Sequence, residues 1–143
     1  MELTRTLIAD AAAVQGGKLY IHGGGWDAIQ ATALPVVHPS LAIAFVMRVE
    51  YSEAMTDIPI VIELLDEDEK PAGPRIDGKV RVGHPAMAQP GNPIFVPQAI
   101  TFNVLQFARY GTYRFRISSN GVTLGETPFR IIPPIQSAPG AHL

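Results

Sequence analysis

The chain of 143 residues contains no cysteine. This absence excludes disulfide bonds, thiolate metal sites and cysteine nucleophiles, and it fits a reducing compartment. The first residues lack the basic start and apolar run of a signal peptide, and the longest uninterrupted apolar run, Leu41 to Met47, is too short to span a bilayer. From these absences we expect a cytoplasmic protein without a membrane segment.

Charged side chains are scarce. They make up 17% of the residues, against about 25% in a typical soluble domain, while hydrophobic residues reach 47%. Because a small domain has much surface, scarce charge implies that some apolar surface is exposed or is covered by a partner. The simplest cover is self-association or a protein partner.

The charges are also distributed unevenly along the chain. Residues 50–69 carry eight acidic side chains and no basic one, whereas residues 70–143 carry eight of the 11 basic side chains and two acidic ones. If these segments lie on different faces, the molecule is electrically polar and can pack acidic face against basic face. If they form adjacent strands, they neutralise each other.

Alternation of apolar and polar residues predicts β-strands through most of the chain. The clearest example is Tyr113–Ile117, and the Asn120-Gly121 pair after it is a strong hairpin signal. The run at 41–49 is apolar on both alternating faces except at its end, as expected of a strand buried on both sides. Further runs of this kind lie at 58–64, 76–82, 96–104 and 129–132.

Two interpretations of residues 3–15 remain open. Leu3, Leu7 and Ala11 keep helical spacing, and Gly16-Gly17 can end a helix. The same segment also alternates as a strand does, with Gly16-Gly17 as the turn into a strand at Lys18–His22. We prefer the strand because everything after it has a β pattern.

Seven or eight short strands, 13 prolines and 13 glycines, with no convincing helix, predict an all-β fold. We expect an antiparallel β-sandwich of about 7–8 strands with immunoglobulin-like or similar Greek-key topology. The segment Tyr110-Gly111-Thr112-Tyr113 resembles the tyrosine corner of immunoglobulin-like sandwiches, with Tyr113 as the corner residue. The expected organisation is one sandwich domain over residues 1–134 and a Pro/Gly/Ala-rich tail over residues 135–143.

The most unusual segment is Gly23-Gly24-Gly25-Trp26-Asp27, which contains the only tryptophan. With Ala28 it formally matches the dinucleotide pattern G-x-G-x-x-A, but no helix or βαβ unit follows to receive a pyrophosphate. The glycines instead indicate close approach of another backbone or of the Trp26 ring. Trp26 either fills one end of the core, which is the commoner role, or anchors a binding surface. We predict Gly23, Gly24, Gly25, Trp26 and Asp27 as candidate binding-surface residues.

Other candidate sites are less specific. Several carboxylates on the loop Asp66-Glu67-Asp68-Glu69 can bind Ca²⁺, with Asp66 and Asp68 as weak candidate ligands, although such a run is more often a solvated hairpin tip. Arg114 and Arg116 share one strand face, but a net charge of −2 favours an ordinary solvated face over a nucleic-acid site. No catalytic constellation is visible. We therefore expect no cofactor, no nucleic-acid partner and no enzyme activity.

Several motifs resemble those of one protein family. The run Ala9-Asp10-Ala11-Ala12, followed by Gly17-Lys18-Leu19-Tyr20-Ile21 and Gly23-Gly24-Gly25-Trp26-Asp27, looks like the opening of a family of small bacterial, often actinobacterial, proteins of unknown function. The resemblance continues in Glu63–Asp68 and Gly111-Thr112-Tyr113, so it spans nearly the whole chain. It implies a compact β-sandwich and supplies no activity, substrate, cofactor or catalytic residue.

Two functional hypotheses follow. The first is a non-catalytic protein-binding or assembly module that acts through self-association or a protein partner. The second is a small-molecule or carbohydrate-binding β-sandwich in which Trp26 is a stacking platform and the acidic loop binds Ca²⁺.

Overall fold

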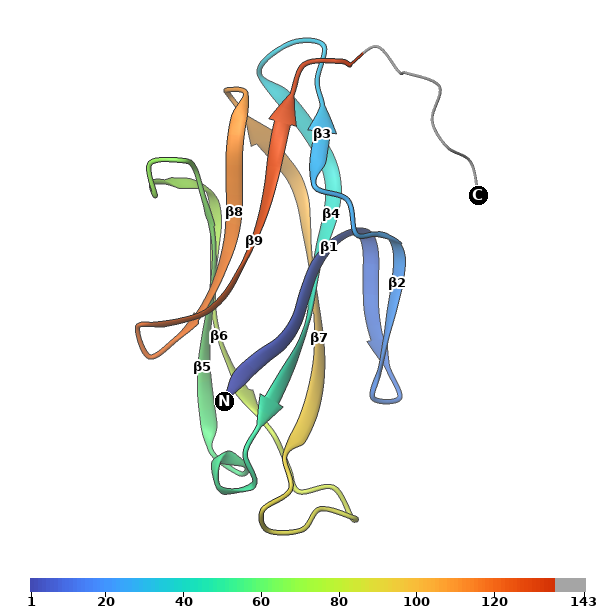
Figure 1. Ribbon diagram of the computed structural model, residues 1–143, viewed down its shortest axis with the longest axis vertical. Coiled ribbons are helices and arrows are strands. Elements are labelled where there is room, and N and C mark those ends of the chain that lie inside the picture. Colours follow the sequence, from blue (N-terminus) through green and yellow to red (C-terminus); the bar gives the residue numbers. More distant parts are fainter. Residues whose placement is uncertain (136–143) are drawn as a thin grey trace.

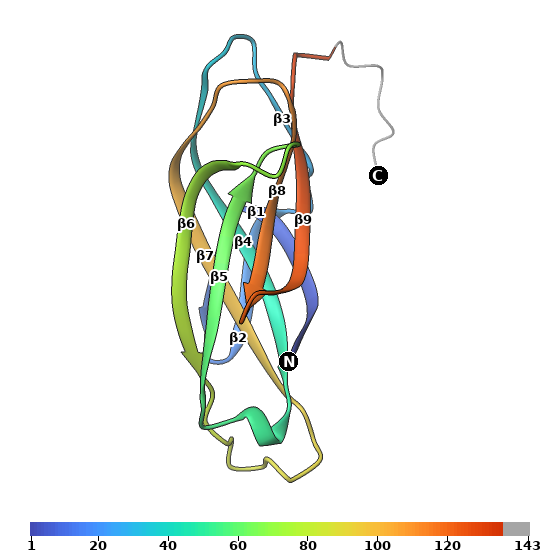
Figure 2. The ribbon, with the colours of Figure 1, turned by 90° about the vertical axis from the view of Figure 1, so that its left-hand side faces the viewer.

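The computed structural model describes residues 1–135, which form two β-sheets packed face to face (Figure 1, Figure 2). One sheet has the strand order β2-β1-β4-β7 and the other has the order β3-β9-β8-β5-β6. This confirms the all-β sandwich, with nine strands in the described residues instead of seven or eight. The elements are β1 (Glu2–Gln15), β2 (Lys18–Gly24), β3 (Ala28–Gln30), β4 (Val36–Val49), a 3-10 turn η1 (Tyr51–Glu53), β5 (Asp57–Leu65), β6 (Pro71–Arg81), β7 (Ile94–Phe107), β8 (Gly111–Ser119) and β9 (Val122–Ile132).

Residues 3–15 form a strand, so the helical alternative is wrong. The first half of β1 pairs antiparallel with β4 and its second half pairs with β2. Gly16 and Gly17 join β1 to β2 with φ angles of +56° and +72°, as a two-residue type I′ turn requires. The additional strand is β3, which is three residues long and pairs parallel with β9. Three residues are too few to show the alternation of apolar and polar side chains by which a strand is predicted from sequence.

The hydrophobic core lies between the two sheets. Phe45, Phe107, Phe115 and Phe129 are fully buried there. The rings of Phe115 and Phe129 are stacked with centroids 5.6 Å apart. Burial of each such side chain contributes roughly 1.5–3 kcal/mol to folding, so the aromatic cluster is a main source of stability.

The predicted tyrosine corner is present at the start of β8. The hydroxyl of Tyr113 donates a hydrogen bond of 2.8 Å to the backbone oxygen of Arg109, four residues upstream. Its ring is buried and meets Phe107 edge-on at 5.0 Å. The bond therefore fixes the β7–β8 connection to the core.

The four-stranded sheet is curled, and this explains why β4 is buried on both faces. Cα atoms of β2 and β7 come within 8 Å of each other, although two strands lie between them in the sheet and a flat sheet would separate them by about 14 Å. The β1–β2 hairpin thus folds back beside the outer face of this sheet (Figure 1). Ala42 and Ala44, which alternate with the core residues of β4, are accordingly buried as well.

The acidic and basic segments neutralise each other across neighbouring strands. Glu63 of β5 pairs with Arg75 of β6 at 3.3 Å, and Asp57 pairs with Arg81 at the same distance. The β5–β6 turn is also ion-paired, because Glu69 lies 3.0 Å from Arg116 of β8. The alternative of oppositely charged faces is therefore wrong.

The tail predicted for residues 135–143 lies outside the described residues except for Ile135, which is exposed. Within the described residues, no helix has the length and hydrophobicity of a membrane span.

Candidate functional site

The glycine-rich segment connects the β1–β2 hairpin to β3, and its glycines are required by close contacts at Gly23 and Gly24 and by positive φ angles at Gly23 and Gly25. Gly23 has a φ of +63°, and a Cβ atom there would collide with the carboxylate of Asp10. A Cβ on Gly24 would lie 2.5 Å from Cγ2 of Ile21. Gly25 has a φ of +88°, and its N–H donates a 3.0 Å bond to the backbone oxygen of Ile8. Close approach is present at Gly23 and Gly24, but the prediction that another backbone or the Trp26 ring makes it was wrong, because the neighbours are side chains of the hairpin.

Trp26 is half-buried at the rim of the sandwich. Its Nε1 donates a 3.1 Å hydrogen bond to Oδ1 of Asp10, and its ring lies 6.0 Å from the ring of His38. The indole packs against the edge of the core without entering it fully. Together with Asp10, His38, Ala28 and Ile29, it lines an open cavity of about 210 Å³. Trp26 therefore covers the edge of the core, and its role as a binding anchor stays a prediction.

Asp27 is exposed, and its backbone oxygen accepts a 2.8 Å bond from the N–H of Arg130 in β9. This bond anchors the end of the glycine-rich segment to the five-stranded sheet. The five predicted binding-surface residues are therefore contiguous at the base of the hairpin.

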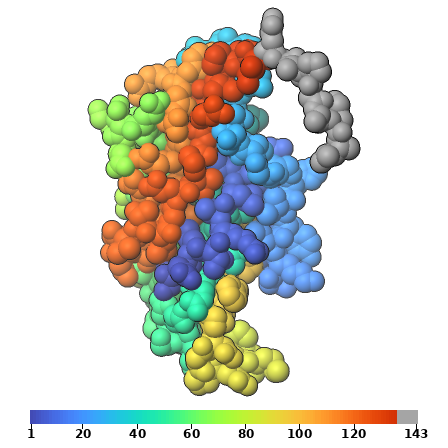
Figure 3. Space-filling view, viewed as in Figure 1, coloured from blue at the N-terminus to red at the C-terminus, as the bar shows by residue number. Residues whose placement is uncertain are grey.

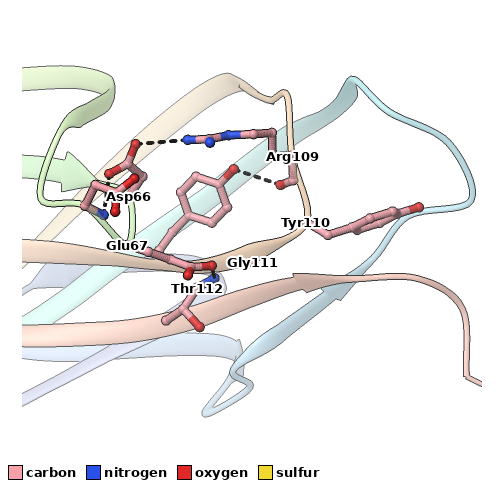
Figure 4. Close-up of a pocket in the computed structure, with 8 residues that line it drawn as sticks. Asp66, Glu67, Arg109, Tyr110, Gly111 and Thr112 are labelled. Atoms are coloured by element: carbon pink, nitrogen blue, oxygen red, sulfur yellow. Dashed lines mark hydrogen bonds and ion pairs between the residues drawn. The ribbon is translucent and has the colours of Figure 1, made fainter.

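The acidic loop is held by its own backbone and by β8 (Figure 4). Oδ1 of Asp66 accepts bonds from the N–H groups of Asp68 at 2.8 Å and Lys70 at 3.0 Å, and Oδ2 lies 3.3 Å from Arg109. The hydrogen bond from the Lys70 N–H, with that from Asp68 and the nearby Arg109 charge, lowers the pKa of Asp66 below its ordinary value. Both oxygens of Asp66 thus have partners within the turn.

Glu67 extends this network to the tyrosine corner. Its Oε1 accepts a 2.9 Å bond from the N–H of Thr112, and it occupies the position that a side chain on Gly111 would need. The loop and corner enclose a small cavity of about 100 Å³. Within residues 1–135, no group of three or more His, Cys, Asp or Glu side chains is arranged to hold a metal ion. The carboxylates of Asp66 and Glu67 are thus accounted for by the turn and the corner that they stabilise.

The basic pair on β8 is neutralised by acidic neighbours. Arg116 lies 2.8 Å from Glu126 of β9 and 3.0 Å from Glu69, and Arg114 contacts the same two carboxylates. The hydrogen bond from Arg116 to Glu126 raises the pKa of the guanidinium further above its ordinary value. A phosphate bound here would have to displace these carboxylates.

The structure adds a feature that the sequence did not reveal, namely the exposed edge of the β1–β2 hairpin. The hairpin stands out from the side of the sandwich, and β2 is its outermost strand (Figure 1, Figure 3). Tyr20 is 55% exposed, Ile21 40% and Val14 38%. Among the described residues, β2 pairs with β1 alone.

The register of the hairpin identifies the unpaired backbone groups. Gln15 and Lys18 flank the two-residue turn and so form a hydrogen-bonded pair. Bonded and non-bonded pairs then alternate, which directs the N–H and C=O of Tyr20 toward β1. The N–H and C=O groups of Leu19 and Ile21 consequently point outward to the open edge.

The other sheet edges carry the usual protection against strand pairing, and β2 does not. The edge strand β6 contains two prolines and four charged residues, β7 contains a proline at position 97, and β3 is only three residues long. By contrast, β2 has one charged residue, Lys18, and no proline. The composition of β2 can be read from the sequence. That no further strand of the described residues pairs with its outer edge cannot be read from the sequence.

Comparison with known proteins identifies one family. The family model described as "Family of unknown function (DUF6941)" matches residues 5–132 of the chain. No curated protein matches the chain.

Proposed function

The chain belongs to this family of unknown function, DUF6941, and we propose that it is a non-catalytic protein-binding or assembly module whose binding element is the open edge of β2. The observation that carries the proposal is the pair of outward-facing residues, Leu19 and Ile21, on an apolar edge without proline. Edges of this kind recruit an extended segment that adds a further strand to the sheet.

The two faces of the hairpin would give such pairing its specificity. Cross-strand partners share a face, so Tyr20 lies beside Ala13 and Ile21 lies beside Ala12. The small alanines leave the ring of Tyr20 open to a partner side chain, in agreement with its 55% exposure. An added strand therefore meets an aromatic contact on one face and aliphatic contacts on the other.

The expected affinity is modest. An antiparallel strand opposite Leu19 and Ile21 exchanges two hydrogen bonds with each, and such bonds contribute about 0.5–1.5 kcal/mol apiece. Burial of apolar side chains makes the binding free energy more favourable, whereas ordering the partner segment and restricting its translation cost several kcal/mol. The balance favours dissociation constants of order micromolar.

The test is selection of strand-forming peptides. A library of displayed peptides about 12 residues long is selected for binding to the full chain, and the selected peptides are then tested for binding to the variant Ile21→Pro. This substitution removes an outward N–H of β2 and leaves the bonds of Tyr20 to β1 intact. We expect enriched peptides with alternating apolar residues whose affinity falls at least about tenfold for Ile21→Pro.

The matched control is Gly16→Asn, in the turn of the same hairpin, which should bind the peptides as the wild type does. Failure to enrich any peptide, or equal binding to the wild type and Ile21→Pro, contradicts the proposal.

Two finer features belong to the same proposal. An immunoglobulin-like topology is supported by the bond from Tyr113 to Arg109 and by two packed sheets whose strands pair antiparallel except for β3 with β9. A cytoplasmic location is supported by the lack of cysteine.

A second candidate function is recognition of a small molecule or carbohydrate in the Trp26 cavity. The half-buried indole, the Asp10 carboxylate and His38 give that cavity an aromatic face beside hydrogen-bonding groups. Because Trp26 is the only tryptophan, its fluorescence reports binding directly. A titration with neutral mono- and disaccharides should shift the emission, and an unchanged spectrum up to about 10 mM sugar counts against this candidate.

The Ca²⁺ part of that second candidate has a separate test. A ligand specific to the folded state must raise its thermal stability. If Tm is the same with Ca²⁺ and with EDTA, the acidic loop is not a calcium site.

A further inference from the structure

Strand alternation divides the side chains of β2 between the two faces of the hairpin. Lys18, Tyr20 and His22 lie on one face, and Leu19 and Ile21 lie on the other. The first face therefore has a cation at the tip of the hairpin, an imidazole near its base and an aromatic ring between them. The second face is apolar. A strand that pairs with the open edge of β2 meets both faces at once.

The face that carries Lys18 has no carboxylate within the hairpin. The β1 residues opposite the three side chains of this face are uncharged, namely Gln15, Ala13 and Ala11. The half of β1 that pairs with β2 contains one acidic residue, Asp10, and alternation places it on the opposite face. β7, the other strand that comes within 8 Å of β2, contains no charged residue. Among the described residues, Lys18 accordingly forms no ion pair.

The small side chains of β1 leave this face accessible. Ala11, Ala13, Tyr20 and His22 are among the residues that border an open groove of about 400 Å³ along the hairpin. Tyr20 is 55% exposed, and the side chains of Lys18 and His22 are exposed as well. The side chains of an added strand therefore reach this face without displacing any other described part of the chain.

We propose that the segment bound by β2 is an acidic, extended segment of a protein partner. This inference rests on the proposed function, because it names the chemistry of the strand that occupies the edge. In antiparallel pairing, the residues set against Leu19 and Ile21 are apolar, and those set against Lys18 and His22 are Glu or Asp. Five successive residues of the partner then have the order acidic, apolar, any, apolar, acidic, and the middle residue lies against Tyr20.

Both polar groups of the Lys18 face suit a carboxylate. Side chains directly opposite each other have Cβ atoms about 4.5–5.5 Å apart, which places a Glu or Asp of the partner within reach of the Lys18 ammonium. The positions opposite Lys18 and His22 are non-hydrogen-bonded pairs, in which side chains lie closest. The imidazole of His22 has an N–H to donate in either charge state. A basic partner strand is instead repelled by Lys18, so the edge selects against it.

Three synthetic peptides test this pattern. One is Ser-Ser-Glu-Val-Thr-Val-Glu-Ser-Ser, acetylated and amidated so that its termini carry no charge, and in the other two both glutamates are replaced by glutamine or by lysine. Fluorescence anisotropy of each peptide, with the same label, measures its affinity for the full chain. At low salt we expect the Glu peptide to bind at least about twofold more tightly than the Gln peptide and at least about tenfold more tightly than the Lys peptide. High salt should reduce both differences.

A charge exchange tests whether Lys18 causes the preference. Lys18→Glu should reverse it, so that the Lys peptide binds more tightly than the Glu peptide. The matched control is Lys79→Glu, because Lys79 is an exposed lysine on the edge strand β6 that also has no ion pair among the described residues. This control changes the net charge by the same amount and should keep the order of the wild type. Far-UV circular dichroism and Tm verify that each variant is folded.

Three results overturn the inference. These are equal binding of the three peptides, an order that Lys18→Glu leaves unchanged, and an affinity for the Glu peptide that Ile21→Pro does not lower. If the designed peptides bind equally or not at all while selected peptides bind in a manner that requires Ile21, the proposed function stands and the acidic pattern is wrong. If no peptide binds, selected or designed, both are wrong.

Discussion

Val104 in β7 has a φ of +58°, a conformation that β-branched residues rarely adopt, and its side chain is 69% exposed. Its place in the register is opposite Pro39, which has no N–H to donate. The strain at Val104 is thus not offset by burial of its side chain.

We expect Val104→Asn to stabilise the fold by about 1 kcal/mol, because asparagine tolerates a positive φ and little packing is lost. Urea unfolding followed by Trp26 fluorescence measures the change. The control Val37→Asn replaces a 54% exposed valine without a positive φ and should be neutral or slightly destabilising. A loss of stability in Val104→Asn equal to that of the control would show that the strain is absent.

Asp66 gives a prediction that depends on pH. Its pKa in the folded state is below the ordinary value of 3.8, chiefly because of the hydrogen bond from the Lys70 N–H. A carboxylate with a lowered pKa contributes stability that is fully present above its unfolded pKa and is lost as the pH falls through the folded one. Asp66→Asn should therefore be less stable than wild type at neutral pH, and the two should converge as the pH falls below the ordinary value of 3.8 and through the lowered folded pKa.

The matched variant is Asp68→Asn, whose side chain makes no hydrogen bond with the described residues, and it should track the wild type across the titration. A constant gap between Asp66→Asn and wild type from neutral to acid pH would contradict the assignment. Chemical unfolding at a series of pH values provides the comparison.

At the level of elements, the β1–β2 hairpin depends on two glycine positions of different kinds. Gly16 and Gly23 both have a positive φ, but a side chain on Gly16 would meet open space, whereas one on Gly23 would meet Asp10. Both positions therefore need a residue that tolerates a positive φ, but only Gly23 also needs a residue without a side chain. The two positions form a matched pair.

We expect Gly16→Asn to change stability by less than about 0.5 kcal/mol, because asparagine suits a type I′ turn. Gly23→Asn should cost roughly 1–3 kcal/mol, because Asp10 must move and release Trp26. The emission of Trp26, the single tryptophan, should shift to the red in Gly23→Asn alone. Equal effects of the two substitutions would mean that Asp10 does not crowd Gly23.

Most elements were predictable because their side chains alternate, and the exceptions have physical reasons. The sequence of β1 agrees with a helix and with a strand, because its alanines fit both the helical spacing and the two-residue alternation of a strand. β3 was not predicted, because three residues are too few to show that alternation. The tyrosine corner at Tyr113 was predictable from a local motif, since its bond reaches only four residues back. The free edge of β2 was not, because a strand's sequence does not say which neighbours it has.

The same reason limits the prediction of the candidate site. Gly23 and Gly24 were expected to admit a close neighbour, and they do, but that neighbour is Asp10 or Ile21, whose proximity depends on the hairpin register. Trp26 as the end of the core and Trp26 as an exposed anchor looked like alternatives. The structure places the ring at the rim of the core, half-buried, and its role as a binding anchor stays a prediction.

For the whole molecule, the two sheets differ in the character of their outer edges. The five-stranded sheet carries proline and charge at its β6 edge, whereas the four-stranded sheet ends at β2, whose hairpin stands out from the side of the sandwich (Figure 1). A composition with 17% charged residues agrees with the exposed apolar side chains of this hairpin. The central claim is that a partner strand pairs with the backbone of β2.

Amide hydrogen exchange of β2 tests that claim most directly. In dilute protein, the amides of Tyr20 and His22 should be protected by β1, while those of Leu19 and Ile21 exchange rapidly. When a selected peptide saturates the protein, or when concentration drives self-association, Leu19 and Ile21 should become protected at least about tenfold and Tyr20 and His22 should change little. Unchanged exchange at Leu19 and Ile21 under saturating conditions would contradict the account.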